Sequence, residues 1–301
     1  MRSSNRDLPV HPYLLLTVSI LAVAVSSIMI KSSATPPSVA GMYRLFITVC
    51  ILLPFVPWTS IRTLSLSLKE WIIVLSAGAA LGLHFLFWME SLSYTSVASS
   101  LVILTLQPFF VMVGAYFLFK ERITVRITLC MLTAIAGSVV IAWGDIGVSR
   151  QALIGDGLSL LGTIAISLYL LAGQRVSRRI PANLYSVIVF AVGGTVMLIY
   201  SAVRHYPLIG YAPSDWVYFV LLAVIPTVFG HFIFNLLLRS IGATAVSVGV
   251  IGEPVLATIL AYFILGEALG GSQLTGGVLT LLGMGTYFWL KASRKSHSLR
   301  A

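Results

Sequence analysis

Long apolar runs alternate with short polar segments along almost the whole chain. Each run holds about 20 residues, the length that an α-helix needs to cross the hydrocarbon core of a bilayer. Proline and glycine residues mark the joints, and no joint has room for a soluble domain. The pattern predicts an all-α integral membrane protein with ten transmembrane helices. These helices are expected at residues 12–31, 37–57, 70–89, 94–119, 123–143, 153–173, 183–203, 214–236, 243–265 and 273–291.

The composition agrees with this interpretation. Of 301 residues, 58% are hydrophobic and only 9% are charged, whereas a soluble domain carries about 25% charged residues. A net charge of +10 suggests a nucleic-acid partner, but the basic residues occur in short clusters between apolar runs, as membrane topology requires. We therefore expect a lipid bilayer and no nucleic acid as partner. The first run follows Arg2 and Arg6 like a signal peptide, but its length and the many later runs favour a retained helix.

The basic residues also predict an orientation. If the N-terminus is cytoplasmic, ten helices return the C-terminus to the cytoplasm, and most of the 19 basic residues then lie in cytoplasmic segments. Only Lys31, Arg150 and Arg204 lie outside, and Arg44 falls within the second run. The predicted location is the inner or plasma membrane of the cell, with both termini cytoplasmic.

The two halves of the chain share one sequence pattern, which indicates an internal repeat. His84-Phe-Leu-Phe87 matches His231-Phe-Ile-Phe234. Further along, Pro108, Ala115, Tyr116, Phe117, Glu121, Gly137 and Trp143 match Pro254, Ala261, Tyr262, Phe263, Glu267, Gly283 and Trp289.

The repeat predicts two five-helix units, at residues 12–143 and 153–291, with short cytoplasmic tails at 1–11 and 292–301. Because five is an odd number, the second unit enters the membrane from the opposite side. Such inverted repeats are common in secondary transporters, whose binding sites lie near the midplane between the repeats.

Several spacings are similar to those of EamA-type members of the drug/metabolite transporter superfamily. They are Lys31, Pro36-Pro37 and Arg44 across the first two runs, Pro108-x7-Tyr116-x4-Glu121, Glu253-Pro254-x7-Tyr262-x4-Glu267, and the segment from Gly155 to Arg178. The resemblance covers about 12–290. It implies ten helices around a central cavity and transport of small metabolites by alternating access, often as export. The first, third, fourth, sixth, eighth and ninth helices would build the cavity. Many relatives carry Trp-Gly where this chain has Val25-Ser26, so a substrate role for that tryptophan is not expected here.

Glu253 is the first candidate for chemistry, since it places a carboxylate inside an apolar run. Ionisable groups at this depth are costly and commonly functional, and a buried carboxylic acid can exchange protons. The alternative is a structural glutamate held by backbone groups that Pro254 frees. Gln107 and Pro108 are the matching residues of the first unit. Gln107 cannot titrate, so any proton coupling belongs to one half only; it binds either substrate or the kinked backbone.

Histidines and other polar residues form a second group of candidates. His84 and His231 could gate or shuttle protons, or be packed structural side chains. Inverted topology predicts that they lie toward opposite leaflets. They lack a His-x3-His or cysteine ligand pattern, so no metal is expected. Asn235 is one turn from His231 and could share its polar face. Arg44 could pair with Glu90 or Glu253, bind an anionic substrate, or extend to the interface.

Aromatic and acidic residues complete the candidates. Trp88 and Tyr169 could form an aromatic substrate surface, although core or lipid packing is an equal alternative. Glu121 and Glu267 each open a helix, so we interpret both as structural caps.

The sequence lacks a nucleotide-binding loop, a dinucleotide fingerprint and a serine nucleophile elbow. We therefore expect a secondary transporter without cofactor, not an enzyme. The expected substrate is a small metabolite, such as an amino acid or a related apolar or aromatic compound, moved by efflux and coupled to protons. A channel or passive lipid- or solute-handling protein is the alternative, and a membrane-embedded enzyme is a weaker one. Both a monomer and a homodimer fit the sequence.

Overall fold

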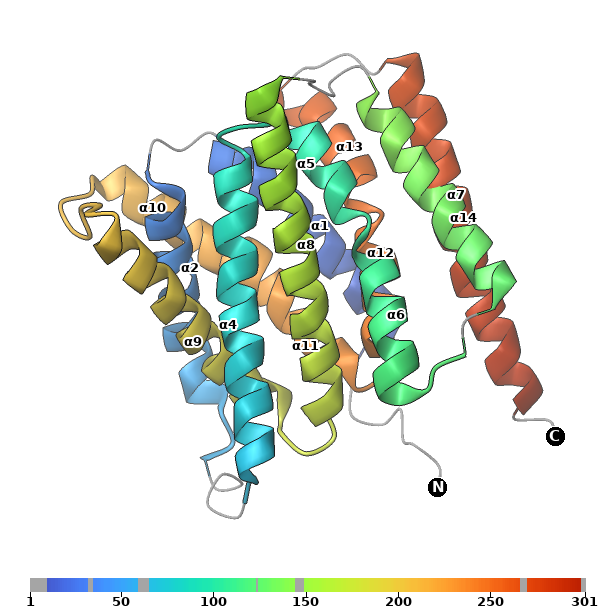
Figure 1. The fold of residues 1–301 in the computed structure, drawn as a ribbon. Helices are drawn as coiled ribbons and strands as arrows, with labels where there is room; N and C mark the ends of the chain where they lie inside the picture. The colour runs from blue at the N-terminus through green and yellow to red at the C-terminus, as the bar shows by residue number, and fades with distance from the viewer. Residues whose placement is uncertain are drawn as a thin grey trace.

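The computed structural model describes residues 10–31, 35–58, 65–122, 124–143, 149–265 and 270–298, and these residues contain helices and no strand. Figure 1 shows the helices packed side by side along one direction, as in a membrane bundle. In chain order they are α1 (Pro12–Lys31), α2 (Pro37–Leu52), η2 (Leu53–Phe55), α4 (Leu68–Ser91), α5 (Val97–Leu104), α6 (Gln107–Phe119), α7 (Val125–Ala142), α8 (Arg150–Val176), α9 (Ala182–Val203), α10 (Pro213–Leu222), η3 (Ala223–Phe232), α11 (Ile233–Leu238), α12 (Gly242–Val250), α13 (Glu253–Leu265) and α14 (Gly271–Ser298).

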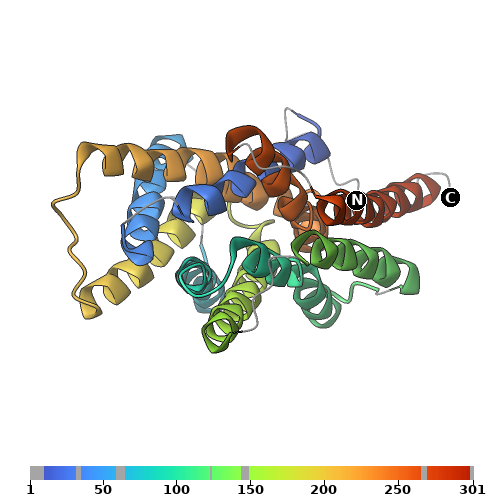
Figure 2. The ribbon, with the colours of Figure 1, turned by 90° about the horizontal axis from the view of Figure 1, so that it is seen from above.

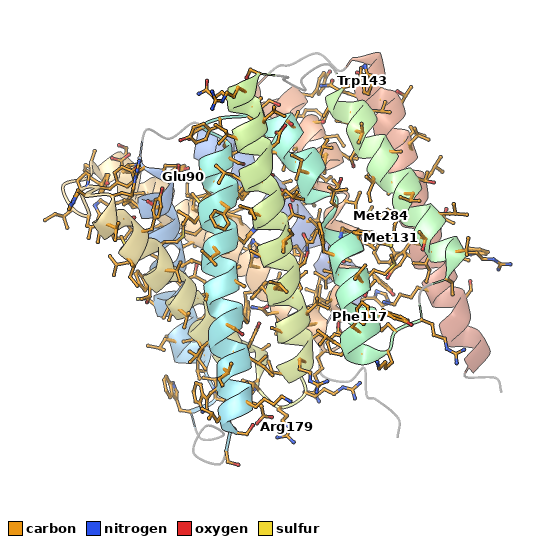
Figure 3. The ribbon with its side chains drawn as sticks, viewed as in Figure 1. Glu90, Phe117, Met131, Trp143, Arg179 and Met284 are labelled. Carbon is orange, nitrogen blue, oxygen red and sulfur yellow. The ribbon has the colours of Figure 1, made fainter. Side chains whose placement is uncertain are left out.

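Eight helical segments among the described residues are long and apolar enough to cross a membrane. They are Pro37–Phe55, Leu68–Ser91, Val97–Phe119, Val125–Ala142, Arg150–Val176, Ala182–Val203, Pro213–Leu238 and Gly242–Leu260, with a shorter apolar helical stretch at Pro12–Ser26. The outer surface is apolar as well: Phe117 on α6 and Trp143 just after α7 are exposed (Figure 3). This is a multi-pass membrane protein.

Two of the spanning segments are broken near their middle. The first separates into α5 and α6 at Thr105 and Leu106, and α6 restarts at Gln107 with Pro108 in its first turn. Proline has no N–H to donate, so it fits the first turn of a helix and not its interior. The second segment separates into α12 and α13 in the same way, and α13 restarts at Glu253 followed by Pro254.

The two broken segments run in opposite directions. In Figure 1, α5 lies above α6 along the first segment, whereas α13 lies above α12 along the second. Matching sequence motifs therefore lie on antiparallel helices, which is the relation that an inverted repeat requires.

A π-helix interrupts the segment that runs from α10 to α11. Pro226 lies inside this ten-residue stretch, where its missing N–H leaves backbone carbonyls without their usual partners. Hydroxyl groups take over: Thr227 Oγ1 donates to the carbonyl of Leu222 at 2.8 Å, and Thr48 Oγ1 donates to that of Ala223 at 3.3 Å. The apolar pattern predicts one uninterrupted helix at 214–236 and does not reveal this π-helix.

One face of α8 is a row of polar side chains at helical spacing, formed by Asp156, Ser159, Thr163 and Ser167. Ser159 Oγ donates to the carbonyl of Ser100 at 3.0 Å. The hydroxyls of Thr163 and Ser167 donate mainly within α8, at 2.8 and 2.7 Å. They also lie 3.4 Å from the carbonyl oxygens of Ile103 and Gln107. We call this row the hydroxyl ladder. It joins α8 to α5 and to the start of α6.

Asp156 anchors one end of the hydroxyl ladder. Its Oδ1 accepts from the Thr95 hydroxyl at 2.8 Å and from the Ser99 hydroxyl at 2.9 Å. Asp156→Ala removes both part-buried hydrogen bonds, and a typical intramolecular hydrogen bond contributes about 1 kcal/mol. We expect this variant to lose about 2 kcal/mol of unfolding free energy, measured by SDS-induced unfolding in mixed micelles. Asp156→Asn keeps the Oδ1 acceptor and should retain most of the unfolding free energy of wild type. Equal losses in the two variants would contradict the role of Asp156 as an anchor.

Helices α7 and α14 pack on each other at one side of the bundle, as the view from above shows (Figure 2). Glycines allow their backbones to approach closely. A Cβ added at Gly276 would lie 2.5 Å from the carbonyl oxygen of Gly137, and one at Gly283 would lie 2.6 Å from that of Cys130. Small residues at helix contacts are typical of membrane proteins. Met131 and Met284 lie where this pair meets the rest of the bundle (Figure 3).

Candidate functional site

A small cavity of about 30 Å³ lies at the centre of the helix bundle. The space that water can reach inside it is therefore small. Helices α1, α2, α4, α5, α6, α8, η3, α11, α12 and α13 contribute to its wall. The lining residues are Val23, Ser26, Arg44, His84, Phe85, Trp88, Leu104, Gln107, Ile166, Leu170, His231, Phe234, Val250 and Glu253.

Residues that match in the two halves of the sequence meet at this cavity. Gln107 begins α6 and Glu253 begins α13, and both line the wall. His84 and His231 line it too, with ring centroids 6.3 Å apart. The prediction that the two histidines lie toward opposite leaflets was wrong, because α4 and η3 both direct these side chains into the central cavity.

Arg44 is the cation of the site and is 1% exposed. Its Nε donates to Thr227 Oγ1 at 2.6 Å, and its Nη1 donates to Ser26 Oγ at 3.1 Å. The guanidinium carbon lies 4.2 Å from the centre of the Phe85 ring, a distance at which a cation is attracted to an aromatic face. Four helical elements, α1, α2, α4 and η3, therefore fix its position.

Neither carboxylate proposed as a partner pairs with Arg44 in the described part of the chain. The one ion pair found there joins Arg179 and Glu70 at 2.8 Å, far from the cavity at one end of α4. Glu90 lies toward the other end of α4 (Figure 3), and its Oε1 is buried without a hydrogen bond. Glu253 faces Arg44 across the cavity, close enough to interact electrostatically but beyond ion-pair distance.

The acidic and amide side chains of the cavity have free hydrogen-bonding capacity. Glu253 is 5% exposed and Gln107 is 2% exposed, and the structure shows no side-chain hydrogen bond for either within the described residues. Two further polar atoms of the cavity residues, Trp88 Nε1 and His231 Nδ1, are buried without a hydrogen-bond partner among the described residues. Buried polar groups normally have hydrogen-bond partners. Unpaired polar atoms are therefore expected at a site where a ligand or water supplies the missing partners.

His84 has a fixed orientation by contrast. Its Nδ1 lies 2.9 Å from the carbonyl oxygen of Gly162 in α8, and its ring stacks on Trp88 with centroids 6.1 Å apart. The other side of this imidazole faces the cavity together with the indole. Trp88, a candidate for an aromatic substrate surface, thus lines the cavity together with Phe85, and we call these two residues the aromatic wall. Its role in binding stays a proposal.

Tyr169 and Asn235 belong to a separate buried network. The Tyr169 hydroxyl donates to Asn235 Oδ1 at 2.6 Å, and Asn235 Nδ2 donates to Ser186 Oγ at 2.9 Å. Neither Tyr169 nor Asn235 lines the cavity. The network joins α8, α9 and α11, and the structure does not bring it together with His231.

Glu121 lies just after α6 and accepts hydrogen bonds from two other helices. Its carboxylate accepts from Gln174 Nε2 at 3.2 Å and from the Thr244 hydroxyl at 3.0 Å. Gln174 in turn accepts from the backbone N–H of Ala243 at 2.5 Å. These bonds join α6, α8 and α12; a capping effect of Glu121 on α7 stays a prediction. Glu267 lies outside the described residues.

Comparison with known proteins identifies the family. The model of the EamA-like transporter family matches residues 11–143 and again residues 153–289. This chain is an EamA-like transporter family member. Membership in the drug/metabolite transporter superfamily, expected from the sequence, is thereby confirmed.

Bacterial relatives of this EamA-like chain carry the name of uncharacterized transporters. One from Clostridium kluyveri is 24% identical over 64% of this chain and 64% of its own length. One from Synechocystis is 24% identical over 75% of this chain and 68% of its own, and YcxC of Bacillus subtilis is 26% identical over 67% and 68%. This chain thus spans about two thirds of their length. A solved crystal structure superposes with a TM-score of 0.77 at 18% identity, covering 93% of this chain and 96% of the other, which shows a common fold.

The sequence pattern does not single out Ser26, which lines the cavity, or Thr227, which contacts Arg44 without lining the cavity. Both hold Arg44, and neither belongs to a residue type that stands out in an apolar run. Ser26 was noted only as part of the departure from Trp-Gly. Pro226 was the available signal for Thr227, because a proline inside a long apolar run indicates a local break with freed carbonyls.

Proposed function

We propose that this chain is a secondary carrier that moves small metabolites across a bacterial inner or plasma membrane by alternating access. The observation that carries the proposal is the convergence of matching residues from both halves, Gln107 with Glu253 and His84 with His231, on one buried cavity. A site between two repeats is where secondary transporters bind substrate.

The proposed architecture is ten helices in two inverted five-helix units, 12–143 and 153–291. Helix α14 would be the tenth, and both termini would be cytoplasmic. The opposite directions of the two broken segments support the inversion (Figure 1), and the clustered basic residues support the orientation. One unit would move against the other to open the cavity alternately to each side.

The proposed substrate is an amino acid or a related apolar or aromatic compound. The wall offers aromatic side chains, Phe85, Trp88 and Phe234, beside one cation and one carboxylate. Pockets of this composition bind small molecules by apolar contact and orient them with few polar groups. Glu253 would carry the coupling proton, because it is the buried carboxylate of the site.

Counterflow in proteoliposomes tests the carrier mechanism. Vesicles preloaded with an unlabelled metabolite should transiently accumulate the same metabolite in labelled form. A carrier that releases unlabelled substrate outside binds labelled substrate there and transports it inward. A panel of amino acids and aromatic metabolites provides the substrates, and empty liposomes provide the control. Saturable flux without counterflow for any transported compound would indicate a channel, and conversion of the compound into a product would indicate an enzyme. Either result would contradict the proposal.

A further inference from the structure

We infer that Arg44 binds the carboxylate group of the substrate, and that the cavity takes up one proton when the substrate binds. This inference rests on the proposed function and names the chemical class and the charge balance of its substrate. Three observations carry it: the partners of Arg44, the unpaired polar groups beside it, and the set of charges around the cavity.

Arg44 has neutral partners only. Ser26 and Thr227 accept two of its five N–H groups, and no carboxylate lies within 4.0 Å in the part of the chain that the structure describes. A buried charge without an ion-pair partner is costly. The remaining guanidinium N–H groups match a carboxylate in a two-point geometry, so an anionic ligand is the group that completes this site.

Thr227 and Ser26 are positioning residues for the guanidinium. Thr227 Oγ1 donates its own hydrogen to the carbonyl of Leu222 at 2.8 Å, so its lone pairs are directed toward Arg44 Nε. The π-helix around Pro226 supplies that carbonyl. The position in α4 that matches Pro226 is Ala79 in a regular helix, so α4 has no counterpart of this π-helix.

The aromatic wall lies beside the proposed carboxylate position. Arg44 stacks over Phe85, and Phe85 contacts His231 with ring centroids 4.9 Å apart. Trp88 Nε1 is buried and has no hydrogen-bond partner in the described part of the chain, so it can donate one hydrogen bond. An apolar or aromatic body with one terminal carboxylate would satisfy the donors and cover the wall.

The charges around the cavity determine the proton balance. The titratable or charged groups that face it are Arg44 on α2, His84 on α4, His231 on η3 and Glu253 on α13, with Tyr218 on α10 near Arg44. Arg44 and an ionised Glu253 compensate each other electrostatically. A bound carboxylate adds a second negative charge, which is costly away from water. One proton from the facing aqueous phase, bound to a Glu253 carboxylate oxygen, restores the balance.

Matched ligands test the carboxylate requirement on the purified protein. The probes are propanoate, 3-phenylpropanoate and indole-3-propanoate, each with its neutral amide and the corresponding primary amine. At least one carboxylate should raise the melting temperature, because a ligand that binds only the folded state stabilises it, while its amide and amine should not. Two results would overturn the inference. Either an amide or an amine raises the melting temperature as much as its carboxylate does, or none of the carboxylates raises it.

Calorimetric titration of the best carboxylate in buffers of different ionisation enthalpy then counts protons. Wild-type protein should take up about one proton per ligand at neutral pH, and Glu253→Gln should take up none. Thr227→Val should weaken binding about tenfold, and Thr227→Ser should restore it, because serine keeps the hydroxyl. No proton uptake by wild type, or full uptake by Glu253→Gln, would overturn the charge balance.

The same experiments separate this inference from the proposed function. Carboxylate binding with proton uptake but without counterflow would leave the inference standing and contradict the carrier. Counterflow of a neutral or cationic compound, unchanged by Arg44→Gln, would leave the carrier standing and contradict the inference.

Discussion

Glu253→Gln is expected to abolish proton-driven accumulation of substrate while exchange of substrate for substrate persists. The variant keeps the shape and hydrogen-bonding capacity of the side chain but cannot bind or release a proton. Gln107, its match in the other half, is already an amide, so no second carboxylate of the repeat can replace it. Uptake driven by an imposed pH gradient in proteoliposomes should fall at least a hundredfold, and equilibrium exchange should change less than about threefold.

Glu90→Gln is the matched control for that experiment. Glu90 lies on α4 toward the end opposite to Arg179 (Figure 3) and does not line the cavity. Its neutralisation should leave both the gradient-driven and the exchange rates close to those of wild type. A Glu253→Gln protein that folds and still accumulates substrate with the wild-type pH dependence would contradict the role of Glu253.

Gly276→Leu should have the largest effect on stability. A Cβ at Gly276 would lie 2.5 Å from the Gly137 carbonyl oxygen and 2.6 Å from the Ile141 nitrogen, both backbone atoms that cannot move aside alone. Overpacking costs about 1–3 kcal/mol and occasionally more, and here two helices must separate. We expect a loss of about 3 kcal/mol of unfolding free energy, measured by SDS-induced unfolding in mixed micelles.

Gly285→Leu on the same helix is the control. A Cβ at Gly285 would meet nothing within 4 Å, and the change from glycine favours a helix interior by about 1 kcal/mol. This variant should match or exceed the stability of wild type. Equal destabilisation by the two substitutions would show that the close contact between α7 and α14 is not what holds the pair together.

Hydropathy and proline positions predict much of this fold. The apolar runs locate the spanning helices, because the bilayer fixes their length. The Pro108 and Pro254 motifs mark the points at which the helices restart, since proline cannot donate within a helix. The second and eighth runs differ from a simple helix in detail: α2 ends in a short tight turn at Leu53–Phe55, and Pro226 lies in a π-helix.

The contacts of the site could not be predicted in the same way. The apolar pattern places His84 and His231 along their helices but does not show how far each helix is rotated or how closely the two approach. Two carboxylates, Glu90 and Glu253, are candidate partners of Arg44 in the sequence. Its observed partners are instead the hydroxyl groups of Ser26 and Thr227. Ser and Thr are common in membrane helices, and only the packed structure distinguishes those that hold a charge.

Access to the cavity from both sides of the membrane is the central claim, and cysteine labelling measures it most directly. Ile166 on α8 is buried and lines the cavity, whereas Leu168 on the same helix is 56% exposed on the outer surface. Each becomes the single cysteine in a protein with Cys50→Ser and Cys130→Ser. A membrane-impermeant thiol reagent should modify Ile166→Cys from either side of a sealed vesicle, transported substrate should protect it, and Leu168→Cys should stay unmodified in lipid. Modification of Ile166→Cys from one side only, or without protection by substrate, would contradict alternating access through this cavity.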